Sequence, residues 1–221
     1  MNSKELEIYK KIKQAILQRK LFPNMQLVEK EIANSFGVSR TPVRNVLRRL
    51  SYERLVKIIE NKGAFVTCSS KEEAKEVFEM RRILEAEAVR KACRLYNQEQ
   101  IQELENLVQE ELREIEQGEY IEALQMSGDF HLKIAEMAGN SYFYQYLEDL
   151  ISLTYVIISI YGRGKERNGT CCNHLEIFHA IKQRDEDLAV KLTVDHLKEI
   201  ESNLHFSDIL PLSTSFSELL T

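Results

Sequence analysis

From Lys71 onward, apolar residues recur at helical spacing over more than half of the chain, and this pattern limits the fold more than any other feature. No segment in this region shows the alternating pattern of a β-strand. The breaks fall at Gly118, at Gly139-Asn140 and from Gly162 to Gly169, where helices commonly stop. The pattern predicts helices over 71–96, 98–117, 119–138, 141–162, 170–184 and 186–204. Such helices with short breaks indicate an antiparallel bundle.

The whole chain is long enough, at 221 residues, for two domains that each bury a core. Its first eleven residues lack the apolar run of a secretory signal, and the longest uncharged run, Leu150 to Tyr161, is too short to cross a bilayer. We therefore expect a cytoplasmic protein. The four cysteines lack the spacing of a disulfide framework or of a CxxC motif, which favours free thiols.

Charge is divided unevenly along the chain. Residues 1–66 contain 14 Lys and Arg against 6 Asp and Glu, a net charge of +8, whereas the remainder has a net charge of −13. A basic segment joined to an acidic one is typical of a nucleic-acid-binding domain attached to a domain with another role. The expected domains are a head at 1–67, a bundle at 71–205 and a C-terminal extension at 206–221.

The head contains a helix-turn-helix pattern. Two amphipathic helices are predicted over 4–20 and 28–36, and Gly37 then provides a turn that needs positive φ. A third helix is predicted to begin with Ser39 as its N-cap, and Pro42 lies in its first turn, where a missing N–H costs little.

The two faces of this third helix differ in character. One face is apolar, formed by Val43, Val46, Leu47 and Leu50, and the opposite face is polar, formed by Thr41, Arg44, Asn45 and Arg48. A solvated charged face is the simpler interpretation of one basic helix, but the preceding turn and the positive charge of the head favour DNA. The polar side chains suit phosphates and base edges, so we interpret this segment as a recognition helix.

A short β-hairpin is predicted after the recognition helix. Residues 55–59 form a β-branched run, Asn61-Lys62-Gly63 supplies turn residues, and 64–66 forms a second strand. The hairpin would form a wing whose tip, at Lys62 and Gly63, approaches the DNA backbone.

The string LVEKEIANSFGVSRTPVRNVLRRLSYERLV…KGAFV resembles the winged-helix domain of the GntR family of bacterial transcription regulators. In that family the second and third helices and the wing tip touch DNA. The resemblance implies DNA contacts at Lys30, Ser39, Arg40, Thr41, Arg44 and Gly63. Some relatives have an arginine where this chain has Lys30, which keeps the charge but loses bidentate geometry.

All five histidines, at 131, 174, 179, 196 and 205, lie in the bundle. A single helical histidine is usually structural, but three on separate helices can converge on zinc or a similar ion.

Three stretches also resemble the all-helical FCD effector domain of the FadR branch of the GntR family: RRILEAEA, FHLKIAEMAGN and HLEIFHAIKQRDEDLAVKLTVDHL. In related domains one aspartate and three histidines hold a metal, and the matching histidines are His131, His174 and His196. His179 and His205 do not match.

The expected aspartate is missing from this chain. The family places it four residues before the first histidine, where this chain has Ser127. Asp129 lies about 200° around the helix from His131 and cannot simply replace it. Two alternatives follow: a three-histidine site for a divalent metal, completed by water or an effector oxygen, and a metal-free pocket.

The resemblance also implies an effector. Related domains often bind a small carboxylate that chelates the metal and pairs with an arginine, matched here by Arg81, and Asn140 matches a polar pocket residue. Arg81 can alternatively form a surface or intrahelical pair with Glu85, which is worth about 0.2–0.5 kcal/mol.

The sequence therefore predicts a mainly α protein, with an N-terminal winged helix-turn-helix domain and a C-terminal all-α antiparallel helical bundle. We expect a homodimeric, ligand-responsive transcription regulator of a palindromic operator, most simply a repressor. The alternative is a metal-dependent hydrolase, but His131 and His196 belong to no general-base motif such as HExxH, so we expect no enzyme activity. The extension at 206–221 has no assigned role.

Overall fold

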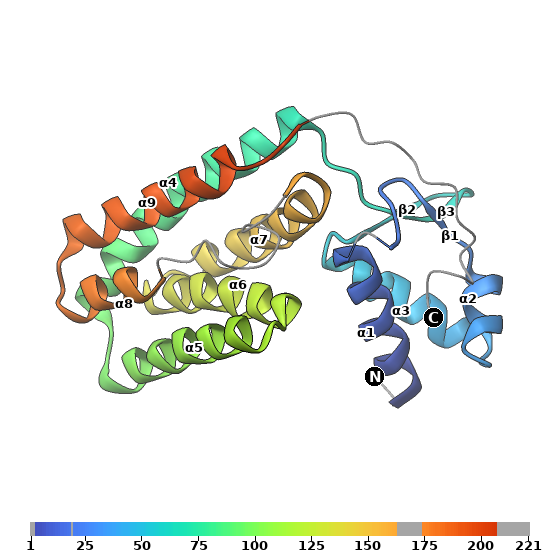
Figure 1. The fold of residues 1–221 in the computed structure, drawn as a ribbon, viewed down its shortest axis with the longest axis horizontal. Helices are drawn as coiled ribbons and strands as arrows, with labels where there is room; N and C mark the ends of the chain where they lie inside the picture. The colour runs from blue at the N-terminus through green and yellow to red at the C-terminus, as the bar shows by residue number, and fades with distance from the viewer. Residues whose placement is uncertain (1–2, 19, 163–173, 207–221) are drawn as a thin grey trace.

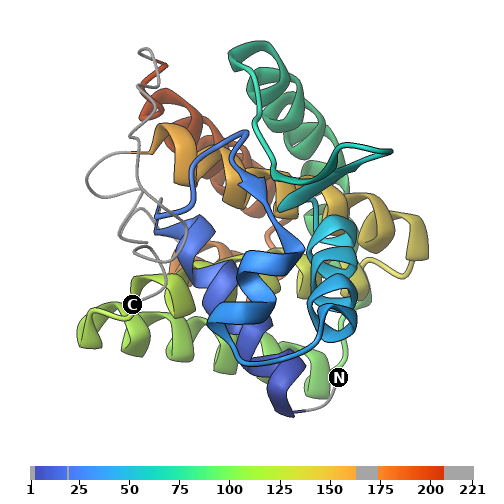
Figure 2. The same cartoon turned by 90° about the vertical axis from the view of Figure 1, so that its right-hand side faces the viewer.

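A computed structural model describes residues 3–18, 20–162 and 174–206 of the 221-residue chain. The head lies at one end of the long axis and the helical bundle at the other (Figure 1). Figure 2, which views the molecule from the head's end, shows the head in front of the bundle. The described residues contain no helix that is long and apolar enough to cross a membrane.

The head combines three helices with a small antiparallel sheet. Its helices are α1 (Ser3–Leu17), α2 (Glu29–Ser35) and α3 (Arg40–Tyr52), and its strands are β1 (Gln26–Leu27), β2 (Val56–Ile59) and β3 (Gly63–Val66). The strand order is β1-β3-β2, and Ile59 pairs with Gly63 where the hairpin turns. The predicted winged helix-turn-helix is confirmed. Two residues are too few to show the alternation of a strand, so the sequence does not predict β1.

The core of the head comes from the apolar faces of α1 and α3. Ile8, Ile12 and Ile16 recur at helical spacing and are almost fully buried, as is the predicted stripe of α3 formed by Val43, Val46, Leu47 and Leu50. Gly37 has a φ of +62° in the turn before α3, so the backbone there adopts the left-handed conformation that the sequence predicts.

The bundle consists of long helices with short connections, as predicted. They are α4 (Lys71–Leu95), α5 (Gln98–Gln117), α6 (Tyr120–Met137), α7 (Ser141–Tyr161), α8 (His174–Lys182) and α9 (Glu186–Ser202). Helix α4 packs against α9 and α7, and α5 packs against α6. Particular residues determine where several helices end. Asn97 and Gln100 form a capping box at the start of α5, and Gly118, with a φ of +79°, follows the last residue of α5. The predicted first turn at 170–173 lies outside the described residues.

An apolar cluster joins the head to the bundle. Buried residues of α1 and α3 belong to the same cluster as Val77 and Phe78 of α4, Val156 and Ile160 of α7, and Leu197 of α9. A second cluster fills the other end of the bundle, around Phe130 and Phe178. Helix α7 contributes to both ends, and it also packs against α1.

Candidate nucleic-acid interface and candidate metal centre

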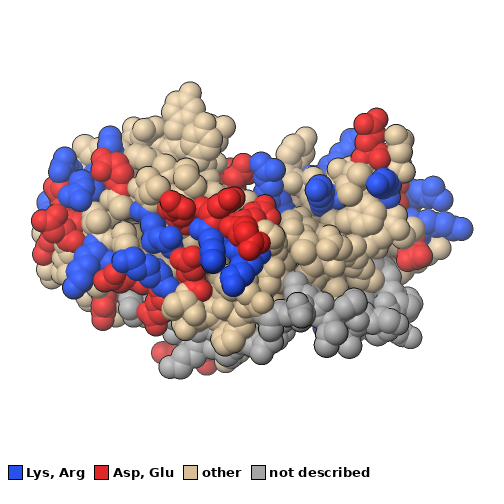
Figure 3. Space-filling view, turned by 90° about the horizontal axis from the view of Figure 1, so that it is seen from above, with Lys and Arg blue, Asp and Glu red and all other residues tan. Residues whose placement is uncertain are grey.

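Every residue that the sequence predicts to contact DNA is exposed on the head. The set comprises Lys30, Ser39, Arg40, Thr41, Arg44, Asn45, Arg48 and Gly63. Ser39 occupies the N-cap position of α3 with an extended backbone, but its side chain makes no capping hydrogen bond. Lys and Arg side chains project from the outer end of the head, whereas positive and negative side chains are interspersed over the bundle (Figure 3). The head therefore presents part of its positive charge at the end away from the bundle.

Acidic residues of the head hold two side chains of α3. The Arg44 guanidinium donates from Nε to Glu29 Oε1 at 3.0 Å and from Nη2 to Glu29 Oε2 at 2.8 Å. Asn45 donates from Nδ2 to Glu5 Oε1 at 2.9 Å. The hydrogen bond from Arg44 is the main reason that the pKa of Glu29 is lowered. A bidentate pair holds the Arg44 fork in a defined direction, and a DNA phosphate or guanine would have to replace Glu29.

The wing tip has a constrained backbone. Asn61 and Gly63 have φ values of +58° and +100°, and the side-chain amide of Gln26 donates to the Lys62 carbonyl at 2.9 Å. The strand β1 therefore ties the wing tip to the segment before α2. This contact holds the turn beside Gly63, whose positive φ is a conformation that glycine adopts without strain.

The three matched histidines converge inside the bundle. His131 from α6, His174 from α8 and His196 from α9 are each at most 3% exposed. His174 Nε2 lies 3.2 Å from His131 Nε2 and 3.2 Å from His196 Nε2. We call these three residues the histidine cluster. His179 and His205, which the resemblance excludes, are exposed.

Buried carboxylates lie beside two of these imidazole rings. His131 Nδ1 lies 2.7 Å from Glu85 Oε2, and His174 Nδ1 lies 2.6 Å from Glu111 Oε2. A carboxylate accepts, so the hydrogen bond to Glu111 places a proton on His174 Nδ1 and leaves the lone pair of His174 Nε2 facing the cluster, whereas the His131–Glu85 contact lacks hydrogen-bond geometry. Glu85 and Glu111 are 3% and 2% exposed. Carboxylate–histidine pairs of this kind accompany metal ligands in many proteins.

Sequence reasoning missed Glu111, although the sequence contains a signal for it. Leu104, Val108 and Glu111 follow helical spacing along the buried face of α5, so an acid continues an apolar stripe. A carboxylate is rarely buried without a partner, and this position therefore indicates a buried polar site.

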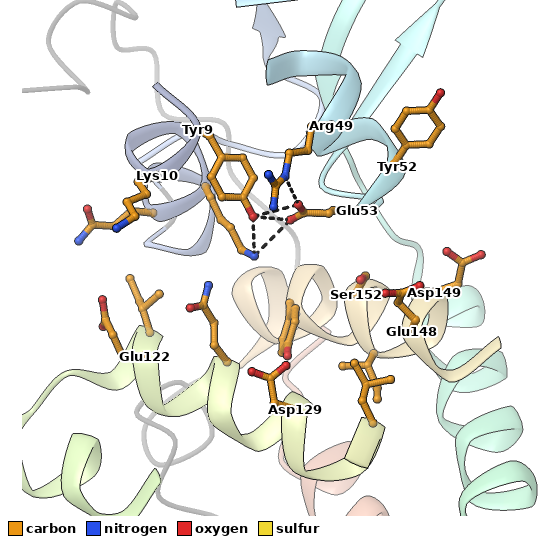
Figure 4. Close-up of a pocket in the computed structure, with 17 residues that line it drawn as sticks. Tyr9, Lys10, Arg49, Tyr52, Glu53, Glu122, Asp129, Glu148, Asp149 and Ser152 are labelled. Atoms are coloured by element: carbon orange, nitrogen blue, oxygen red, sulfur yellow. Dashed lines mark hydrogen bonds and ion pairs between the residues drawn. The ribbon is translucent and has the colours of Figure 1, made fainter. Parts of the chain in front are cut away.

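The donor set fits a divalent metal. Nitrogens that ligate tetrahedral zinc at about 2.0–2.1 Å lie about 3.3–3.4 Å apart, close to the spacing found here. Lone pairs at such distances repel unless a cation or proton lies between them. Within the described ranges, the histidine cluster is the one group of such ligand side chains that could hold a metal ion. Ser127 is half-buried, and Asp129 faces a cavity between head and bundle instead (Figure 4).

Arg81 and Glu85 form a pair that is buried, not on the surface. Arg81 Nε donates to Glu85 Oε1 at 2.6 Å, and Arg81 Nη1 donates to Thr154 Oγ1 at 3.2 Å. Burial alone would raise the pKa of Glu85, but Arg81 and His131 outweigh it and hold that pKa at about 2. Burial lowers the pKa of His131, and the neighbouring Glu85 carboxylate offsets only part of this effect.

Two predicted effector residues differ in their surroundings. Arg81 Nη2 is buried without a hydrogen-bond partner among the described residues, and such a group favours an anion nearby. Asn140 is exposed, and its side chain accepts from Tyr142 N at 3.1 Å as the N-cap of α7. The structure thus gives Asn140 a capping role and leaves Arg81 with an unused donor.

Family models match both halves of the chain. The model described as "Bacterial regulatory proteins, gntR family" matches residues 4–66, and the model described as "FCD domain" matches residues 76–199. The chain belongs to the GntR family and carries an FCD domain. The predicted family is confirmed. This GntR-family protein is a DNA-binding transcriptional regulator and not an enzyme, so the hydrolase alternative is dropped.

Other transcription regulators are similar to this chain over most of their length. The regulator is 24% identical over 199 residues to the HTH-type transcriptional repressor RspR of Escherichia coli (strain K12), covering 90% of this chain and 87% of RspR. It is 26% identical over 193 residues to the HTH-type transcriptional regulator YdhC of Bacillus subtilis (strain 168), covering 86% of each. Its fold matches that of E. coli McbR/YncC with a TM-score of 0.68 at 21% identity, covering 90% of this chain and 95% of the other.

Proposed function

We propose that this regulator is a repressor that binds a near-palindromic operator as a homodimer and responds to a small carboxylate held near a metal in its FCD domain. The observation that carries the proposal is the buried histidine cluster, backed by two carboxylates, in a chain whose head exposes a recognition helix. The similarity to RspR, a named repressor, favours repression.

On DNA, the polar face of α3 would read bases and the flanking residues would contact phosphates. Arg44 and Arg48 suit guanine or phosphate, Asn45 suits adenine, and Lys30 and the wing tip suit the backbone. One recognition helix covers only a half-site, and two heads related by a twofold axis would read a palindrome. Homodimerisation therefore accounts for specificity that one short helix does not supply.

In the FCD domain, His131, His174 and His196 would hold a divalent metal such as zinc through Nε2. The bound ion would supply positive charge that attracts a carboxylate. Glu111 would keep the His174 imidazole in the required tautomer, Glu85 would supply negative charge beside His131, and Arg81 Nη2 offers a further donor to an anion. Three histidines leave a metal position open for water or an effector oxygen, which fits the serine at position 127.

The DNA-binding part is tested by fluorescence anisotropy with fragments that the wild-type protein selects from a random library. Arg44→Ala should weaken binding to the selected operator by about tenfold or more, because a bidentate arginine is worth about 1–3 kcal/mol. Lys75→Ala, an exposed charge change on α4, is the matched control. Wild-type protein without salt-sensitive, sequence-selective binding would contradict the proposal.

The metal part is tested by calorimetric titration of zinc into chelator-treated protein. Wild-type protein should bind one zinc ion per chain, and His174→Ala should abolish this binding, because it removes one of three ligands. His179→Ala, on the same helix but exposed, should bind zinc like the wild type. Equal zinc binding by His174→Ala and wild-type protein would rule out the site.

A further inference from the structure

A continuous line of polar contacts runs from the histidine cluster to α7. His131 Nδ1 meets Glu85 at 2.7 Å, Glu85 accepts from Arg81 Nε at 2.6 Å, and Arg81 Nη1 donates to Thr154 Oγ1 at 3.2 Å. Thr154 donates in turn to the Leu150 carbonyl at 2.9 Å. Arg81, Glu85, His131 and Thr154 are all at most 3% exposed, so water does not compete with these contacts.

The same helix holds the head. Asp149, next to Leu150 on α7, accepts from Arg54 Nη2 at 3.0 Å. Arg54 lies two residues beyond the end of α3, with a φ of +58°. Thr154 and Asp149 lie five residues apart, so they point to different sides of α7, one toward the effector pocket and one toward the head. A shift of α7 therefore moves the carboxylate that contacts the end of the recognition helix.

Beside this contact, head and bundle face each other across a cavity of about 730 Å³ (Figure 4). The head contributes residues of α1 and α3, including Lys10, Lys13 and Arg49, and the bundle contributes Glu122, Asp129 and Glu148. On the head side Glu53 pairs with Lys13 and Arg49, whereas the charged residues on the bundle side are all acidic. The cavity lies beside the apolar cluster that joins head and bundle, so the Arg54–Asp149 ion pair holds the head together with that cluster.

We propose that Asp149 is a positioning residue for the DNA-binding head, acting through Arg54, and that Thr154 links it to the Arg81–Glu85–His131 contacts. A ligand in the pocket would then shift α7, and this shift would move the end of α3 through the Arg54–Asp149 contact. This inference rests on the proposed function, because it assumes that the histidine cluster and Arg81 hold the ligand. Linkage is reciprocal, so a ligand that shifts α7 changes operator affinity, and operator binding changes ligand affinity by the same factor.

The contact between head and bundle is tested by exchanging its charges in the full chain. Operator affinity is measured by anisotropy, with zinc and after chelator treatment, for Asp149→Arg, Arg54→Glu and the double variant. In wild-type protein zinc should change operator affinity by about fivefold or more, a usual coupling. Each single variant should lose this zinc effect, and the double variant should regain it because the ion pair is restored with reversed sign. Glu76→Arg, a charge reversal at an exposed position of α4 outside the cavity, should keep it.

The link to the pocket is tested at Thr154. Thr154→Val removes the acceptor for Arg81 and should abolish the zinc effect on operator affinity while zinc still binds. Thr193→Val is the matched control, because Thr193 is equally buried and also donates to the carbonyl four residues before it, on α9. Thr154→Ser keeps the hydroxyl and should keep the zinc effect. Loss of the effect in Thr154→Val alone would then come from the missing hydroxyl and not from misfolding.

The possible failures have different meanings. Wild-type protein that selects no operator would contradict the proposed function itself. Wild-type protein that binds an operator with no zinc effect would contradict the inference, and so would a zinc effect that survives both Asp149→Arg and Thr154→Val. A double variant that does not regain the effect would show that Asp149 does not act through Arg54.

Discussion

Glu85 contacts two groups that the sequence presents separately, Arg81, which is expected to bind an effector, and His131, which is expected to bind a metal. The spacing of four residues allows an Arg81–Glu85 pair as an alternative to effector binding by Arg81, and the structure contains this pair. Because the pair is buried, losing one partner costs more free energy of folding than it would on the surface. An exposed pair of this spacing contributes about 0.2–0.5 kcal/mol, whereas a buried charge that loses its partner costs about 3–5 kcal/mol.

Glu85→Gln should therefore destabilise the chelator-treated protein by about 3–5 kcal/mol, because it leaves the buried Arg81 charge uncompensated. Urea denaturation of chelator-treated protein measures the change in the free energy of unfolding. Glu87→Gln, an exposed change on the same helix, should shift it by about 0.5 kcal/mol or less. A similar small loss for Glu85→Gln would show that Arg81 is not paired as described.

Helices α6 and α7 approach closely at Gly128. A Cβ on Gly128 would lie 1.6 Å from the Tyr155 hydroxyl oxygen and 3.0 Å from Ile151 Cγ2. A glycine within a helix normally weakens it by about 1 kcal/mol relative to alanine, so Gly128 reflects packing and not helix propensity. This contact positions α6, which carries His131, against α7, which carries Thr154.

Gly128→Ala should consequently destabilise the protein, by about 1–3 kcal/mol, although the same change in an exposed helix would stabilise it. Thermal denaturation measures the effect, and adding Tyr155→Leu should recover part of the loss, because a shorter side chain makes room for the methyl group. Higher stability of Gly128→Ala would contradict the described packing of α6 on α7.

Helices α2 and α3 are connected by the Glu29–Arg44 pair, both of whose members are partly exposed. Glu29→Gln should raise non-specific DNA affinity by about two- to tenfold, because it removes a negative charge from a phosphate-facing surface. Anisotropy with a random duplex at several salt concentrations measures this change. Glu72→Gln, a distant change on α4, should leave the affinity unaltered. Unchanged binding by Glu29→Gln would indicate that this surface does not face DNA.

Across the molecule, the histidine cluster ties together three helices that are far apart in sequence. His131, His174 and His196 come from α6, α8 and α9, so an ion held by all three would bind only the folded chain. The apolar cluster that runs from the head into α4, α7 and α9 extends the effect to the whole chain.

Zinc at one hundred times its dissociation constant should thus raise the free energy of unfolding by about 2.7 kcal/mol, and chelator should reverse the gain. Denaturant titrations with and without zinc measure this difference. His196→Ala should show no gain from zinc, whereas His205→Ala, an exposed histidine, should behave like the wild type. Zinc stabilisation that persists in His196→Ala would place the ion elsewhere.

Periodicity, turn residues and charge were sufficient to predict the helix-turn-helix, the wing and the bundle. Helix ends lie within three residues of those predicted, apart from the start of the 170–184 helix, whose first turn lies outside the described residues. These features are local, because apolar spacing, Gly37 and Gly118 act on their own segments. Glu111 and the Arg54–Asp149 contact were not predicted, since each joins residues far apart in sequence. The sequence by itself determined which helices form and that the head is positive. Only the tertiary structure decided which polar side chains are buried together, because burial and partner geometry arise when separate helices pack.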